Sequence, residues 1–322
     1  MATMNVKALL FALCLAILAP DPRPMLAQET GPFALAVLRR DGLVVPFATF
    51  SGKRWAKRWP ERKPLELPIS LGDVPDAWWG IEPPRRMHLW NEGVRIGEVL
   101  LKEPTVAALM CEPRPALKSD YKATAPVPPR FVLPYPKDGL LVSGDVPVMP
   151  IDAVEPDGAE GKNVLALAVD QFNKQENLAA GRFTSWRHPL KAAERKLLPI
   201  VIEALYRAPI DDPGWTAYFM EAVRQFPPGP AEKDGCGLAT YASGWVIVGP
   251  GGASRTWLGA RVTYCDRKGV GYMLPFGRVR ANDRTYWVFQ YAGFEAEAYE
   301  VARPAKGGVQ AEVVYTVGTC GR

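Results

Sequence analysis

VQAEVVYTV, residues 309–317, is the stretch that decides the fold. Its odd-numbered positions are all apolar (Val309, Ala311, Val313, Tyr315 and Val317), and its even-numbered positions are mainly polar. In a β-strand, successive side chains point to opposite faces of the sheet, so a period of two is typical of a half-buried strand. The stretch therefore predicts a strand whose odd-numbered face lies on a core.

The same period extends back to residue 238 and predicts six strands. Their separators are turn sequences rich in Gly, Pro, Asn and Asp. The predicted strands are Leu238–Val248, Thr256–Tyr264, Gly271–Arg280, Thr285–Tyr291, Ala296–Ala302 and Val309–Val317. Thr285–Tyr291 is apolar on both faces, so we expect it in the middle of the sheet. The short connections favour an antiparallel meander, with curling into a partial barrel as one option.

Helical periodicity precedes these strands, between residues 163 and 226. Asn163–Ala180 is predicted to be a helix with Leu167, Phe172 and Leu178 as core contacts. Pro189–Arg207 is predicted to be a second helix, kinked at Pro199, because apolar residues recur at steps of three and four. Those residues are Leu190, Ala193, Leu197, Val201 and Leu205. A third, short helix is expected over Trp215–Phe226.

The N-terminal part, residues 28–112, is predicted to be rich in strands. Phe33–Leu38 and Leu43–Phe50 flank the turn Arg40-Asp41-Gly42 and predict a hairpin. Val94–Leu101 and Val106–Cys111 are further strand candidates, separated by Glu103-Pro104.

Residues 113–162 hold many prolines, each of which removes a backbone donor, so we expect an extended connector there. The connector either links two domains or wraps across one continuous fold. The expected division is a signal peptide (1–27), a β-rich region (28–112), the connector (113–162), and a helical segment followed by an antiparallel sheet (163–322). The expected fold class is α+β.

Residues 1–27 have the features of a secretory signal peptide. Lys7 is followed by twelve uncharged residues, Ala8–Ala19, and by prolines from Pro20 onward. A helix needs roughly 20 apolar residues to span a bilayer, so this run fits a signal better than an anchor. We expect cleavage after Ala27, export to a periplasmic or extracellular space, and no stable membrane span afterwards. An uncleaved anchor is the alternative.

Cysteine usage also predicts export. Removal of Cys14 with the signal leaves an even number, Cys111, Cys236, Cys265 and Cys320, which in an exported chain predicts two disulfides with three pairings open. A hairpin register with Val246 opposite Leu258 would bring Cys236 near Cys265, so we favour Cys236–Cys265 and Cys111–Cys320. No C-x-x-C pair occurs, and His88 and His188 are the only histidines, so a metal site is not expected.

Composition and motifs exclude several function classes. The chain is 48% hydrophobic and 23% charged, as in globular proteins, and its net charge of +5 implies no particular partner. No G-x-S-x-G, H-E-x-x-H, EF-hand or Walker A sequence occurs. We therefore expect no cofactor. Export makes nucleic acid an improbable partner, and the oligomeric state is not indicated.

Tryptophans and basic residues gather in one segment that predicts a ligand-binding surface. The candidate binding residues are Lys53, Arg54, Trp55, Lys57, Arg58 and Trp59, together with Trp78 and Trp79. Indole rings stack on sugars, and cations attract anionic polymers. The alternative is a hairpin edge whose tryptophans pack inward while its lysines and arginines stay in water.

Catalytic candidates are weak. His188 and Glu194 have no partner that the sequence can place, and a glycosidase-like carboxylate pair would have to come from separate elements. The leading hypothesis is an exported, non-catalytic module that binds a glycan or another envelope component. A secreted hydrolase that uses carboxylates is the alternative, and a structural or assembly protein is the third.

Overall fold

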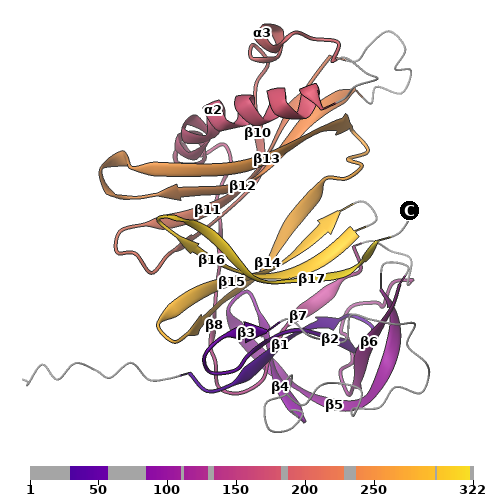
Figure 1. Cartoon of the computed structure of the whole chain (residues 1–322). Coiled ribbons are helices and arrows are strands. Elements are labelled where there is room, and N and C mark those ends of the chain that lie inside the picture. Colours follow the sequence, from indigo (N-terminus) through magenta and orange to yellow (C-terminus); the bar gives the residue numbers. More distant parts are fainter. Residues whose placement is uncertain are drawn as a thin grey trace, which may run out of the picture.

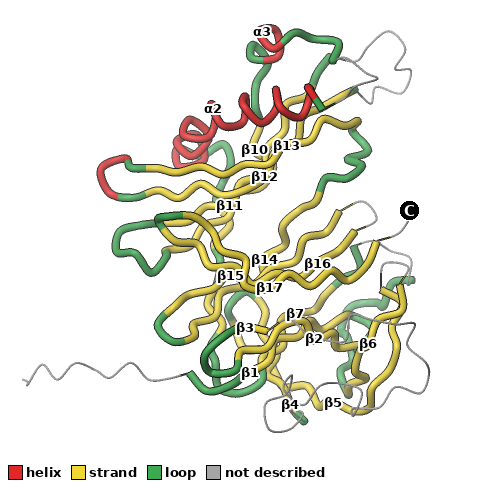
Figure 2. The backbone as a smooth tube through the Cα atoms, in the orientation of Figure 1, coloured by secondary structure: helices red, strands yellow, loops and turns green. Residues whose placement is uncertain are grey.

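The structure is a computed structural model that describes residues 30–56, 85–109, 112–129, 134–182, 188–227, 237–293 and 296–319. The proposed signal peptide lies outside these residues. Strands account for 58% of the described residues and helices for 13%, and the sheets are antiparallel (Figures 1 and 2). The chain is therefore mostly β, and it contains less helix than the expected α+β class implies.

Seven strands from the N-terminal part form one sheet in the order β1-β7-β4-β5-β6-β2-β3. Because β1 also pairs with β2, six of these strands form a closed ring of hydrogen-bonded neighbours. Their bounds are β1 Phe33–Arg39, β2 Leu43–Phe50, β3 Trp55–Ala56, β4 Arg86–Asn91, β5 Val94–Leu109, β6 Glu112–Ser119 and β7 Lys137–Val142. The predicted hairpin is confirmed as β1–β2. The two strands predicted after residue 94 are one long strand, β5, which continues through Glu103-Pro104.

The proline-rich segment touches all three sheets of the molecule. It supplies β6 and β7 to the ring, then β8 (Val148–Met149) to the sheet of β14, and β9 (Asp152–Ala153) to the sheet of β10. The expected boundaries after residues 112 and 162 fall inside β6 and inside α2 (Ala159–Gly181).

The remaining strands form two five-stranded sheets, β13-β12-β11-β10-β9 and β17-β16-β15-β14-β8. Their bounds are β10 Val201–Pro209, β11 Thr216–Gln225, β12 Leu238–Val248, β13 Ser254–Tyr264, β14 Gly271–Ala281, β15 Arg284–Gly293, β16 Ala296–Ala305 and β17 Gly308–Thr319. All six predicted strands are confirmed, and β15 is central as expected. The single meander is wrong, because residues 265–270 carry the chain from one sheet into the other.

The hairpin register also differs from the expected one. Val246 lies opposite Thr256, not Leu258, because the turn at Pro250–Gly252 is shorter than the one assumed. Tyr264 at the end of β13 consequently pairs with Leu238.

One long helix, α2, covers the outer face of the β10–β13 sheet (Figure 1). The helix predicted over Asn163–Ala180 is confirmed, and Phe172 is fully buried. Leu167 and Leu178 are 38% and 50% exposed, so their expected core contacts are wrong. The buried face instead follows Val164, Ala168 and Phe172, at steps of four.

Two predicted helices are wrong. Within Pro189–Arg207 only one turn forms, α3 (Ala192–Arg195), and the chain then enters β10 two residues after Pro199. Proline removes a helical hydrogen bond and clashes with the preceding turn, which explains the break. Most of Trp215–Phe226 is β11, an interior strand that is buried on both faces. Such a strand carries apolar residues on both sides, so their spacing can resemble helical periodicity.

The molecule is a stack of layers: α2, the β9–β13 sheet, the β14–β17 sheet, and the ring (Figure 1). Phe219 and Trp245 pack against Trp287 and Phe289 between the two open sheets. On the other face of the β14–β17 sheet, Tyr299 packs 5.3 Å from Phe47 of the ring, measured between ring centroids.

A β-bulge divides the strand that decided the fold. Val301 pairs with Val313 and the next residue, Ala302, pairs with Ala311, so the register shifts within β17. Val313 and Tyr315 therefore pack against the ring, whereas Val309 packs between the two open sheets. The expectation that all five odd-numbered residues share one face is wrong, because the extra residue of a bulge changes the alternation.

Candidate functional site

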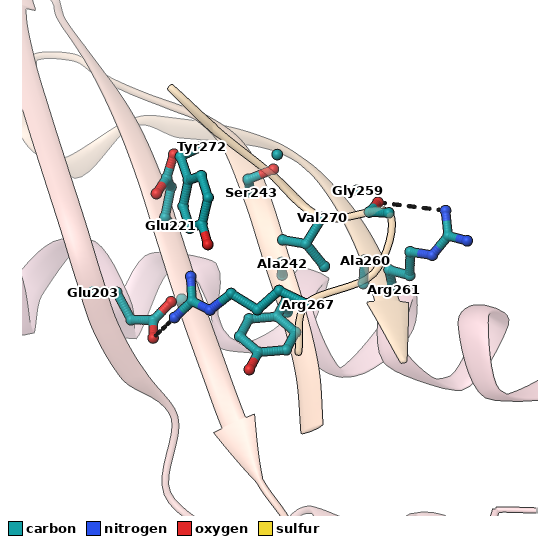
Figure 3. A pocket seen from close by; sticks show the side chains of 14 residues that line it. Glu203, Glu221, Ala242, Ser243, Gly259, Ala260, Arg261, Arg267, Val270 and Tyr272 are labelled. Atoms are coloured by element: carbon teal, nitrogen blue, oxygen red, sulfur yellow. Dashed lines mark hydrogen bonds and ion pairs between the residues drawn. The ribbon is translucent and has the colours of Figure 1, made fainter. Parts of the chain in front are cut away.

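A pocket of about 270 Å³ lies where the chain crosses from β13 into β14 (Figure 3). We call it the crossover pocket. Its walls come from β10–β13, from the start of β14, and from the crossover itself, residues 265–270.

The pocket exists because one row of side chains across the sheet is smaller than the aromatic row beside it. Glu221 lies opposite Ser243, and Ser243 lies opposite Gly259. The next row, two residues along each strand, is filled by Phe219, Trp245 and Trp257. In the row of Glu221, Ser243 and Gly259, a carboxyethyl group, a hydroxymethyl group and a hydrogen atom stand where the next row has three aromatic rings. The row therefore leaves a hollow on the face that points toward the second sheet. Polar groups converge in that hollow, as they do in ligand sites.

Arg267 on the crossover forms one wall. Its guanidinium pairs with Glu203 of β10, as Figure 3 shows. The guanidinium carbon lies 4.6 Å from the ring centroid of Tyr241 and 5.1 Å from that of Tyr272. Both distances are within the range of about 6 Å over which cations are attracted to aromatic faces.

Glu203 reaches the pocket because of an irregularity in β10. The β10–β11 register shifts between Ile202 and Ala204, so Glu203 is the extra residue of a bulge and Ala204 lies opposite Glu221. The bulge thus places two carboxyl groups in the wall of one pocket.

Glu221 is the buried carboxyl of the site, only 7% exposed. One carboxyl oxygen accepts a hydrogen bond from the backbone N–H of Met273, which attaches the start of β14 to β11. Burial, reinforced by the nearby charge of Glu203, raises the pKa of Glu221 to about 7 despite that bond. A carboxyl group with such a pKa changes charge near neutral pH.

The second sheet contributes another such group. Glu300 of β16 lies opposite Phe289, so its side chain points into the space between the sheets. Burial raises the pKa of Glu300 to about 7. The pKa of Tyr291 is raised by its own burial and also by the charges of Glu300 and Glu221. The hydroxyl of Tyr291 therefore interacts electrostatically with both carboxyl groups.

Comparison with known proteins gives no relative. No family model, curated protein or solved structure matches the chain.

The predicted tryptophan surface is only partly described. Trp55 is half-buried and packs against Phe33, Phe50 and Tyr286, with ring centroids 5.2 to 5.4 Å apart. Lys53 and Arg54 are exposed. Lys57, Arg58, Trp59, Trp78 and Trp79 lie outside the described residues. The placement of Trp55 matches the inward-packing alternative, and the binding role of the other residues stays a prediction.

Of the two weak catalytic candidates, His188 lies before α3 and Glu194 within it, and neither lines the crossover pocket. His188 Nδ1 accepts a hydrogen bond from the N–H of Leu190, and its ring packs edge-on against Phe226. The Glu194 carboxylate accepts from the N–H of Lys191 and so caps the helix. Both residues have structural partners.

Neither a metal cluster nor a spanning helix is found in the part of the chain that the structure describes. Its histidine, cysteine and acidic residues form no group of three that could hold an ion. None of its helices is long and apolar enough to cross a membrane.

The sequence does not point to Glu221 or Arg267 as residues of the site. Read as a helix, Trp215–Phe226 scatters its side chains around an axis, whereas the strand pattern puts Glu221 in line with Ala217 and Phe219 on one apolar face. That carboxyl on a buried face was the available signal. Arg267 stands in Arg267-Lys268-Gly269, the turn sequence between the predicted strands Thr256–Tyr264 and Gly271–Arg280, and nothing local indicates where a turn side chain will pack.

Proposed function

We propose that this chain is an exported, non-catalytic binding protein whose ligand, a small polar envelope component, enters the crossover pocket. The observation that carries the proposal is the row Glu221–Ser243–Gly259, which leaves a polar hollow in an otherwise aromatic interface. Its carboxyl and hydroxyl groups offer both donors and acceptors to a polar ligand. A glycan at the tryptophan segment remains a second mode of binding within the same proposal.

Export is supported by the signal-like residues 1–27 and by cysteine usage. Cys265 is disulfide-bonded, while Cys111, Cys236 and Cys320 lie outside the described residues. Cys265 directly follows Tyr264, and Tyr264 pairs with Leu238, two residues after Cys236 in the sequence. This proximity favours the proposed Cys236–Cys265 pair, with Cys111–Cys320 as the other.

A hydrolase is the second candidate, and one observation favours it. Glu203 and Glu221 line one pocket, with Glu203 paired to Arg267 and the pKa of Glu221 raised to about 7. Two carboxyl groups in such different environments can divide the roles of base and acid. In this alternative Glu221 is the general acid.

Filling the pocket tests the proposal. A Cβ added at Gly259 meets no atom closer than 4.0 Å, the distance to the Ser243 carbonyl oxygen, so the backbone has room for a side chain and Gly259→Leu should fill the hollow. We expect the wild-type protein to bind a member of a panel of glycans, peptidoglycan fragments and small polar metabolites, and Gly259→Leu to weaken that binding at least tenfold. Isothermal titration calorimetry measures both.

Gly97→Leu is the matched control, since Gly97 lies on an exposed strand with no neighbour within 4 Å of an added Cβ. Equal binding by Gly259→Leu and the control would contradict the proposal. The same mixtures are analysed for reaction products. Turnover by the wild type that Glu221→Gln abolishes would favour the hydrolase instead.

A further inference from the structure

The crossover pocket contains a cation-binding arrangement that the protein itself occupies. Arg267 is held by a carboxylate, Glu203, and by the faces of two aromatic rings, Tyr241 and Tyr272. We call Glu203, Tyr241 and Tyr272 the cage. Carboxylates form charge-assisted hydrogen bonds with guanidinium groups, and aromatic faces attract them.

The backbone conformation at Arg267 indicates that an arginine stands there for the contacts of its side chain. Its φ is +57°, a left-handed conformation that favours glycine, asparagine or aspartate. The turn is closed by backbone hydrogen bonds from Arg267 N–H to Tyr264 and from Val270 N–H to Arg267. Glycine would satisfy this turn at a lower conformational cost, so the arginine is explained by what its side chain contacts.

The cage opens onto free space. The crossover pocket is lined by Arg267 together with Glu221 and Ser243. Figure 3 shows Arg267 reaching to Glu203, with Tyr272 beside its guanidinium. An outside molecule can therefore approach the cage along the pocket, whose wall also carries a second carboxyl group, Glu221.

We propose that the cage binds the guanidinium group of an external ligand, and that Arg267 is an internal competitor that keeps the site closed. The inference rests on the proposed binding function and names its ligand class. A planar guanidinium fits better than an ammonium group, because it can donate to Glu203 while its faces lie against aromatic rings. The group could belong to a small molecule or to an arginine side chain of a peptide.

Replacing Arg267 tests whether the cage binds an external guanidinium group. Agmatine carries a guanidinium on a butylamine chain, and putrescine carries an ammonium group in its place. We expect Arg267→Ala to bind agmatine at least tenfold more tightly than the wild type does, and more tightly than it binds putrescine, by isothermal titration calorimetry. Glu203→Gln in the Arg267→Ala background should reverse the gain. A Gly-Arg-Gly peptide blocked at both ends distinguishes a peptide source from a small molecule.

Arg261→Ala is the matched control. Arg261 also lines the pocket, but its guanidinium bonds the carbonyl of Gly269 and extends away from Arg267 (Figure 3). An equal gain in this variant would show a general charge effect and overturn the inference. Should Arg267→Ala fail to fold, Arg267→Met keeps the aliphatic bulk and is measured in its place.

A folded Arg267 variant that binds neither agmatine nor the peptide would also overturn it. The two proposals fail separately. If the protein binds a neutral ligand, Gly259→Leu abolishes that binding, and agmatine does not bind, the guanidinium inference is wrong and the proposed binding function stands.

Discussion

At the scale of single residues, the protein keeps two titratable carboxyl groups in its interior. Glu221 and Glu300 lie between the two open sheets with pKa values raised to about 7, in both cases chiefly by burial. A raised carboxyl pKa means that the folded state retains a proton that the unfolded chain releases. Folding is therefore favoured below the ordinary pKa of about 4.5, and this advantage is lost as the pH rises toward 7.

We predict that the free energy of unfolding falls between about pH 4.5 and 7 and that Glu221→Gln flattens the fall. A shift of this size for Glu221 corresponds to at most about 3 kcal/mol. Urea denaturation at a series of pH values measures it. Glu103→Gln, on an exposed side chain, is the control and should leave the profile as it is in the wild type. A wild-type profile that rises toward pH 7 would contradict the assignment.

Elements differ in how far the sequence predicts them. Strands with one buried face, such as β16 and β17, are recognised from alternation, because one side is more open to water. β11 is buried on both faces and loses that signal, so it was assigned to a helix. The crossover pocket was missed for the same reason: it depends on which residues of β11, β12 and β13 lie opposite one another, and that register is a property of pairs of strands.

For α2 the sequence predicts the helix and the burial of Phe172, but not the rest of its buried face. We expect Phe172→Ala to lower the free energy of unfolding by about 3 to 5 kcal/mol, because Phe172 is fully buried against the β10–β13 sheet. Leu178→Ala, on the same helix and half-exposed, should cost less than about 1 kcal/mol. Chemical denaturation followed by circular dichroism compares them. Equal losses would mean that the helix packs by a different face.

At the scale of the whole molecule, ring and sheets form one body. Lys137 of β7 donates hydrogen bonds to the Glu297 carboxylate of β16 at 2.8 Å and to the Tyr135 carbonyl at 2.7 Å, and both members of the ion pair are 5% exposed. Tyr299 donates to the other oxygen of Glu297. Burial lowers the pKa of Lys137, and the charge of Glu297 opposes that effect. This buried pair joins the ring to the β14–β17 sheet.

We predict one cooperative thermal transition, and we expect Lys137→Met to move all of it downward. Removing the lysine leaves Glu297 as a buried charge without its cation, a loss of about 3 to 5 kcal/mol. Lys118→Met breaks an exposed pair with Glu103, which solvent screens, and should leave the transition nearly unchanged. Differential scanning calorimetry separates the cases. Two transitions, of which only one responds to Lys137→Met, would show that the ring unfolds independently.

The contacts of β17 also set the order in which the chain can fold. Val313, Tyr315 and Val317 of β17 belong to the same core as residues of β1 and β2, which precede them by more than 260 residues in the sequence. The apolar residues of the ring therefore stay uncovered until β17 has been synthesised. Long sequence separation between contacting residues slows folding and prolongs the time in which exposed strands can aggregate. Deletion of β17 alone would thus leave the core of the ring without its cover.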